Sequence, residues 1–154
     1  MSDVGGDEIL LVEDHTSDAE LAMHALEKSR LVNTIVCVDD GEKALDFLFC
    51  RGEYSHRHFT SPPRLVPLDL KLPKVDGMQV LQDLKSHPRT RAIPVILLTA
   101  SKEDRDVVES YQLGVNSYIQ KPVNFNDFQD VVKQLGMYWL LVNARPPAAA
   151  FAKG

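Results

Sequence analysis

The chain of 154 residues has little cysteine and no run of basic residues. Its two cysteines, Cys37 and Cys50, form no CxxC pair, and both fall in apolar patterns, on an expected strand and an expected helix. We therefore interpret them as reduced core residues of a cytoplasmic protein rather than as a disulfide or a redox pair. The formal net charge of −5, with no Lys/Arg-rich stretch, argues against a nucleic-acid partner.

Long apolar runs and a targeting signal are also missing. No apolar stretch reaches the roughly 18 residues that suggest a membrane span. The acidic start, residues 1–8, has neither the basic nor the apolar region of a signal peptide, so we expect no membrane association. The 44% apolar and 25% charged fractions fit one globular domain. We place that domain at residues 8–144, between a flexible leader (1–7) and a flexible Ala/Pro-rich tail (145–154).

Short apolar runs of strand length alternate with amphipathic helical patterns. This alternation predicts a flavodoxin-like doubly wound α/β fold, with a five-stranded parallel sheet and helices on both faces. A capping box at residues 17–20, Gly114 after a helix, and Asn124 or Asn126 before the last helix predict helix ends. The expected strands are residues 9–12, 34–38, 65–70, 93–98 and 116–120.

The connection at residues 52–63 is longer than is usual between such elements, which indicates a surface insertion or a partner-facing loop. It contains His56 and His58, but no neighbouring carboxylate or cysteine completes a metal shell, so we interpret this pair as solvated. The remaining histidines are likewise expected at the surface: His15, His24 and His87.

The last expected helix is apolar more than halfway round at residues 137–142. A helix with apolar residues on all sides is buried, either within its own domain or against a partner. We favour a homodimer interface over packing inside the domain, because the exposed patch would be large.

Carboxylates stand at the ends of two expected strands: Glu13 and Asp14 after the first, and Asp69 at the end of the central one. Because the carboxyl ends of parallel strands line one crevice, we expect these side chains to meet. Three carboxylates in one crevice repel each other unless a cation is present. A hard divalent ion with oxygen ligands, Mg²⁺, fits this site.

A carboxylate beside Mg²⁺ can act as a nucleophile toward a phosphoryl group and form an acyl phosphate. Thr99 and Lys121 end the fourth and fifth expected strands at the same crevice. The Lys121 ammonium and the Thr99 hydroxyl can each pair with an oxygen of a phosphoryl group on Asp69.

These residues resemble the signature of bacterial response-regulator receiver domains, from about Glu8 to Leu135. The resemblance implies that Asp69 is the phosphoacceptor, that Glu13 and Asp14 serve Mg²⁺, and that Lys71 is a metal ligand through its backbone carbonyl. It also implies that Thr99 and Tyr118 form a switch pair and that Lys121 pairs with the phosphate. The Lys121-Pro122 bond is expected to be cis. The motifs that carry the resemblance are Val12-Glu13-Asp14, Leu68-Asp69-Leu70 with Leu72-Pro73 and Asp76-Gly77, Leu98-Thr99-Ala100, and Tyr118-Ile119-Gln120-Lys121-Pro122.

Within that family, the long loop and the ending at residues 138–143 are similar to stand-alone receivers that partner bacterial phytochromes and related kinases. This likeness implies a sensor histidine kinase or a phosphotransfer protein as donor, and a downstream protein as target. With about a dozen residues after the last helix, we expect no attached output domain. We expect no enzyme activity beyond self-phosphotransfer and self-dephosphorylation.

Pro67 departs from the family pattern, which has an aliphatic residue two positions before the phosphoacceptor. Proline in a central strand removes a hydrogen-bond donor, so it indicates a bulge, a strained site or an altered residue. It supports one alternative, a receiver that signals without phosphorylation. An Asp-nucleophile phosphohydrolase would need an acidic residue where Lys71 stands, and a flavin carrier would need a phosphate cradle that residues 14–18 lack.

Overall fold

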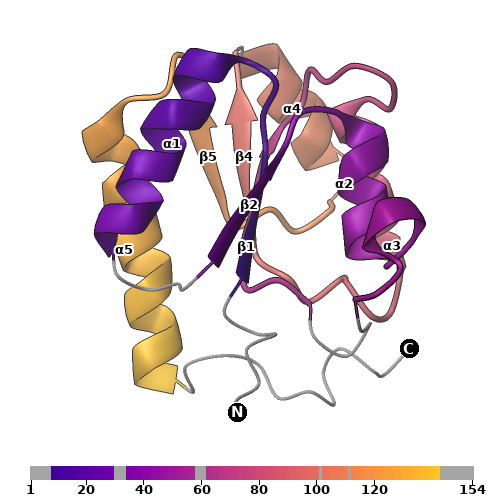
Figure 1. The fold of residues 1–154 in the computed structure, drawn as a ribbon. Coiled ribbons are helices and arrows are strands. Elements are labelled where there is room, and N and C mark those ends of the chain that lie inside the picture. The colour runs from indigo at the N-terminus through magenta and orange to yellow at the C-terminus, as the bar shows by residue number, and fades with distance from the viewer. Residues whose placement is uncertain (1–7, 30–33, 58–61, 101, 111, 143–154) are drawn as a thin grey trace.

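The computed structural model describes residues 8–29, 34–57, 62–100, 102–110 and 112–142. Five parallel strands form one sheet in the order β2-β1-β3-β4-β5, which confirms the predicted flavodoxin-like fold (Figure 1). The strands are β1 (Glu8–Val12), β2 (Thr34–Val38), β3 (Val66–Asp69), β4 (Val95–Thr99) and β5 (Ser117–Gln120). The helices are α1 (Thr16–Ser29), α2 (Gly41–Leu48), the 3₁₀ turn η2 (Gly52–Tyr54), α3 (Gly77–Ser86), α4 (Lys102–Ser110) and α5 (Phe125–Val142).

The central strands are buried on both faces, because side chains alternate between two packing layers. In β1, Leu10 and Val12 pack with the residues of α2 and α3, whereas Ile9 and Leu11 pack with those of α1 and α5. Figure 1 shows the corresponding arrangement, with α1 and α5 side by side on one face and α2 and α3 on the other. This packing holds the carboxyl ends of β1, β3 and β4 at one edge.

Helix ends match the sequence patterns only in part. Ser17 lies inside the first turn of α1 and does not precede the helix as a capping box requires, so that prediction is wrong. Because α4 ends at Ser110, Gly114 (φ 75°) does not directly follow the helix as predicted. Gln112 (φ 53°), which lies nearer to the helix end, also takes the left-handed conformation. Asn124 caps α5, since its Oδ1 accepts the backbone N–H of Asp127 at 3.1 Å.

Pro67 lies within β3 without a bulge. The pairs on either side of it keep the same offset between β1 and β3, namely Ile9 with Leu65 and Val12 with Leu68. On the other side, β3 pairs with β4 continuously. The backbone N–H groups of Val66 and Leu70 donate toward β4, so the position of Pro67 faces β1 by alternation. The proline therefore removes one donor toward β1 and leaves the register intact.

The start of the long loop is anchored to the domain by Arg57. Its Nη2 lies 3.0 Å from Oε1 of Glu8, and its guanidinium lies 3.6 Å from the centroid of the Phe47 ring. Such a stacked and paired arginine holds the segment before residue 58 against β1 and α2. His56 is exposed, as predicted.

Several predictions fall outside what the structure describes. Residues 1–7, 58–61 and 143–154 are not described, which removes His58, the leader and the tail from comparison. The side chains of residues 136–142 are also not described, so the predicted homodimer interface stays a prediction. Among the helices that are described, none combines the length and the apolar character needed to cross a membrane.

Candidate functional site at the carboxyl ends of β1 and β3

The predicted carboxylates meet at one edge of the sheet. Asp69 is the last residue of β3 and is 1% exposed, and Glu13 directly follows β1 and is 2% exposed. Asp14 lies beside them and is exposed. Single ligand atoms of these three residues and of His15 all lie within 4.8 Å of one another. The structure therefore assembles the predicted carboxylates and adds His15, which is exposed as predicted.

Lys121 brings a cation to this cluster from the turn after β5. Its Nζ lies 2.9 Å from Oε2 of Glu13 and 3.1 Å from Oδ2 of Asp69. Burial lowers the pKa of Lys121, but hydrogen bonds and charge interactions with Glu13 and Asp69 outweigh burial and raise it. The ammonium stays charged and balances two buried carboxylates.

The pKa of Asp69 is raised, first by burial and then by the charge of Glu13. Two donors act in the opposite direction: the backbone N–H of Lys71 donates to Oδ1 at 3.1 Å, and Lys121 donates to Oδ2. A divalent cation at the cluster would add to those donors and favour the ionised, nucleophilic form of Asp69.

Asp18 contributes to the site from the first turn of α1, which the sequence reasoning missed. Its Oδ1 accepts the backbone N–H of Val123 at 3.0 Å, and its Oδ2 lies 3.4 Å from Nζ of Lys121. The Lys121-Pro122 bond between these contacts is cis, as the family resemblance implied. The sequence pattern places Asp18 only in a helix cap, because sequence spacing carries no signal for a contact between α1 and the turn after β5.

The two predicted switch residues lie on the same face of the sheet. Thr99 ends β4 and is buried, and its carbonyl accepts the backbone N–H of Lys121 at 2.8 Å. Thr99 of β4 pairs with Gln120 of β5, and Tyr118 stands two residues before Gln120. Because side chains two residues apart in a strand share a face, Thr99 and Tyr118 point to the same face of the sheet. Tyr118 is half-buried, with the Arg105 guanidinium of α4 4.5 Å from its ring centroid. Their coupling stays a prediction.

The turn from β3 to α3 packs directly against the backbone of Asp69. A Cβ built on Gly77 would lie 2.2 Å from the carbonyl oxygen of Asp69, so only glycine fits there without movement. The N–H of Gly77 donates to the carbonyl of Leu70 at 2.9 Å, and Asp76 caps α3 by accepting the N–H of Met78. This turn fixes the backbone that carries Asp69.

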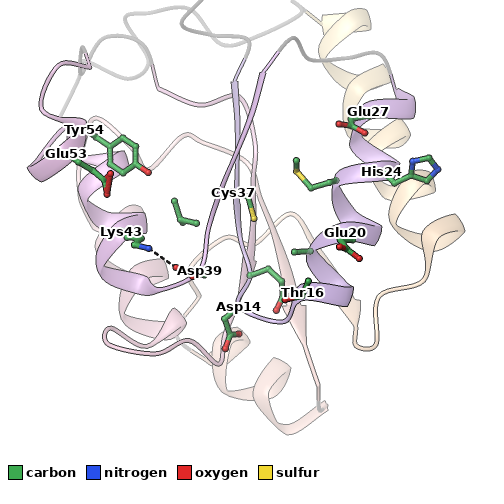
Figure 2. Close-up of a pocket in the computed structure, with 14 residues that line it drawn as sticks. Asp14, Thr16, Glu20, His24, Glu27, Cys37, Asp39, Lys43, Glu53 and Tyr54 are labelled. Atoms are coloured by element: carbon green, nitrogen blue, oxygen red, sulfur yellow. Dashed lines mark hydrogen bonds and ion pairs between the residues drawn. The ribbon is translucent and has the colours of Figure 1, made fainter.

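A pocket of about 640 Å³ adjoins the site along β2, between α1 and α2 (Figure 2). Cys37 lies in this pocket and is exposed, so the prediction that it belongs to the core is wrong. The reason is the strand order, which puts β2 at the edge of the sheet. Cys50 is half-buried just after α2, not on a helix. Six carboxylates line the pocket: Glu13, Asp14, Glu20, Glu27, Asp39 and Glu53.

The residues of the cluster fit a divalent cation. Oε1 of Glu13 is buried and has no hydrogen-bond partner among the described residues, which costs free energy unless something satisfies it. Glu13, Asp14 and Asp69 offer oxygen donors, which Mg²⁺ prefers. A site of this composition is typical of divalent metal binding. Lys71 contacts Asp69 through its N–H, and the metal contact predicted for its carbonyl stays a prediction.

Comparison with curated proteins finds relatives over nearly the whole chain. The "Probable methanogenesis regulatory protein FilR2" of Methanothrix harundinacea is 45% identical over 141 residues, covering 92% of this chain and 88% of that protein. Response regulator Rcp1 of Synechocystis is 40% identical, covering 91% of this chain and 93% of Rcp1. These relatives therefore share almost their entire length with the chain.

Solved structures give the same result. The bacteriophytochrome response regulator RtBRR has a TM-score of 0.78 at 46% identity, over 96% of this chain and 89% of that one. Two further structures each have a TM-score of 0.74 at 38% identity, and each match covers 92% of this chain and 99% of the other. They are a phosphorylated cyanobacterial phytochrome response regulator, RcpA, and the Mn²⁺-bound form of Rcp1. The model of the response regulator receiver domain family matches residues 9–133. The chain belongs to that family and is close to phytochrome-associated response regulators.

Proposed function

We propose that Asp69 accepts a phosphoryl group from the phosphohistidine of a sensor histidine kinase, and that a partner protein reads the aspartyl phosphate. A carboxylate oxygen of Asp69 attacks phosphorus and forms the new P–O bond. The P–N bond breaks, and its electron pair returns to the imidazole nitrogen of the kinase. The observation that carries this proposal is the contact of Lys121 Nζ with both Glu13 and Asp69 in a buried acidic cluster.

Each residue of the cluster has a separate task in this proposal. Lys121 already donates to Oδ2 of Asp69, so it is placed to pair with an oxygen of a phosphoryl group bound there. Glu13 and Asp14, with Asp69 and the Lys71 carbonyl, would hold Mg²⁺, which supplies neutralisation of the charge on the phosphoryl oxygens. Self-phosphotransfer from small donors and self-dephosphorylation use the same residues.

The output that we propose is a change in protein contacts. Thr99 would respond to the phosphoryl group, and Tyr118 would carry the response to the face formed by α4, β5 and α5. The position of Tyr118 between β5 and Arg105 of α4 supports this assignment, because a ring at that place contacts both elements. We infer that residues 8–144 form the unit that switches.

The donor that we propose is a phytochrome-like histidine kinase. RtBRR and RcpA are named as phytochrome response regulators, and their similarity extends over at least 92% of this chain. FilR2, at 45% identity, is named for methanogenesis, so identity at this level does not fix the stimulus. The proposed kinase class therefore rests on the solved structures.

The test is the mass of the intact protein after incubation with acetyl phosphate and Mg²⁺. We expect the parent to gain one phosphoryl group, and the Asp69→Asn variant to gain none. Asp106→Asn is the matched control, since Asp106 is exposed on α4 and should leave phosphorylation unchanged. A folded parent that gains no phosphoryl group would contradict the proposal and favour a receiver that signals without phosphorylation.

A further inference from the structure

His15 directly follows Glu13 and Asp14, the predicted metal pair. Its side chain is largely exposed, yet its ring joins the acidic cluster. Its Nδ1 lies 3.2 Å from Oε2 of Glu13, 3.4 Å from Oδ1 of Asp14 and 4.0 Å from Oδ2 of Asp69. One ligand atom from each of these four residues lies within 4.8 Å of the other three. A single ion placed among the three carboxylates would therefore also be within reach of the imidazole.

The imidazole of His15 also lies beside the Lys121 ammonium. Nζ lies 3.1 Å from Nδ1 of His15 while it donates to Glu13 and Asp69. The role of Nδ1 in this contact depends on the imidazole tautomer, and in the tautomer with its proton on Nε2 the lone pair of Nδ1 faces the ammonium and the carboxylates. A lone pair on a ring nitrogen is what a metal ion needs from histidine.

A second observation points independently to a cation at this place. Glu13 is buried, and its Oε1 has no hydrogen-bond partner in the part of the chain that the structure describes. Its other oxygen, Oε2, already accepts from Lys121 and from the backbone N–H of His15. A divalent ion bound by the carboxylate would satisfy the oxygen that the protein leaves unpaired.

We propose that His15 is a direct ligand of the metal at this site and biases it toward divalent transition-metal ions. This proposal rests on the proposed function, because it concerns the metal site that serves Asp69. Mg²⁺ is a hard ion that prefers oxygen, whereas imidazole suits the first-row transition metals. A mixed set of three carboxylates and one imidazole therefore gains affinity for an ion such as Co²⁺ that an oxygen-only set does not have.

The experiment uses the full chain without a histidine tag. Pulsed electron paramagnetic resonance of the Mn²⁺-loaded protein detects nitrogen bound to the ion, and calorimetry measures the affinities for Co²⁺ and Mg²⁺. In the parent we expect a nitrogen signal, which His15→Ala abolishes. The same variant should lose about tenfold or more in Co²⁺ affinity, the scale seen when a metal site loses a supporting group, with little change for Mg²⁺.

Two further variants make the result decisive. His24→Ala is the matched control, because His24 lies on α1 beside the adjoining pocket and contacts Phe125 rather than the cluster. It should change neither the signal nor the affinities. Asp14→Asn tests the site itself, and it should weaken binding of both ions.

The outcomes separate the two proposals. If Asp14→Asn weakens both ions but His15→Ala leaves the nitrogen signal and the Co²⁺ affinity unchanged, the role of His15 is overturned and the proposed function stands. An equal loss for Co²⁺ and Mg²⁺ in His15→Ala, with no nitrogen signal in the parent, also overturns it. If Asp14→Asn changes neither affinity, the metal site and both proposals fail together.

Discussion

Oδ2 of Asp18 lies 3.4 Å from Nζ of Lys121, so a carboxylate at the start of α1 shares the lysine that contacts the expected phosphoacceptor. The other oxygen of Asp18 accepts the backbone N–H of Val123. Both contacts reach from α1 to the turn after β5, and Asp18 is buried where it makes them. Asp18 is therefore a positioning residue for Lys121.

Replacing Asp18 should separate its charge from its hydrogen bond. In Asp18→Asn an amide oxygen can still accept from Val123, so we expect the free energy of unfolding to change little while phosphorylation by acetyl phosphate slows. In Asp18→Ala the buried N–H of Val123 loses its partner, and the free energy of unfolding should fall by about 1–3 kcal/mol. Urea unfolding and the time course of intact mass measure the two effects.

The control for this prediction is Asp127→Asn, an exposed acid in the first turn of α5. It should leave both measurements unchanged. Equal phosphorylation rates in the parent and in Asp18→Asn would show that the charge of Asp18 does not act on Lys121.

Gly77→Ala should damage the site through the backbone. The added Cβ would meet the carbonyl oxygen of Asp69 at 2.2 Å, so the turn between β3 and α3 must move. Forcing an atom into a packed position costs about 1–3 kcal/mol, and we expect a loss of that size in urea unfolding. Because Asp69 moves with the turn, phosphorylation should slow as well.

Gly114→Ala is the comparison for the glycine prediction. Gly114 has φ 75°, and no atom lies within 4 Å of an added Cβ. The substitution should therefore lower the free energy of unfolding by about 1–2 kcal/mol, through the left-handed backbone conformation alone. It should lower stability without slowing phosphorylation. If the two variants slowed phosphorylation equally, the close approach of Gly77 to Asp69 would not be the cause.

The titration of Lys85 should make the free energy of unfolding depend on pH. Its Nζ donates to the carbonyls of Arg91 and Ile93 at 3.1 Å and 3.0 Å, and burial lowers its pKa to about 8. The unfolded chain keeps the ordinary value of about 10.4. Between these values the unfolded chain binds more protons than the folded one, so the free energy of unfolding should rise with pH in this window. The neutral amine still has two N–H groups for the two carbonyls.

The measurement for Lys85 is urea unfolding at several pH values between about 7 and 10, on the parent and on Lys85→Gln. Glutamine cannot titrate, so the difference between the two proteins isolates the lysine. We expect that difference to move in favour of the parent as the pH rises from about 8. A difference that stays constant would show that Lys85 titrates at its ordinary pKa.

Sequence reasoning could predict the fold and the carboxylate cluster because both depend on order along the chain. Alternating strand and helix patterns specify a parallel sheet, and residues that end parallel strands meet at one edge. Glu13, Asp14, Asp69 and Lys121 are all residues of that kind. Their meeting required no knowledge of side-chain packing.

The features that sequence reasoning missed depend on tertiary distance or strand order. Cys37 sits in an apolar run but on the edge strand β2, and an edge strand cannot be told from a central one by its own sequence. Asp18 and His15 stand near a helix start, where a polar residue usually serves the helix or the solvent. Their contacts with Lys121 cross more than a hundred positions of the chain, which no local pattern encodes.

Pro67→Val should leave phosphorylation almost unchanged. The register between β1 and β3 is the same on both sides of Pro67, so restoring the backbone N–H should not move Asp69. Valine is close to proline in volume, and it regains a hydrogen bond worth about 1 kcal/mol. It also loses the restriction that proline places on the unfolded chain, about 0.4–1 kcal/mol, so the free energy of unfolding should change by less than about 1 kcal/mol.

The phosphorylation rate of Pro67→Val should stay within about twofold of the parent, equivalent to about 0.4 kcal/mol in the barrier. A parent that is inert and a variant that is phosphorylated would instead identify Pro67 as the cause of a phosphorylation-independent receiver.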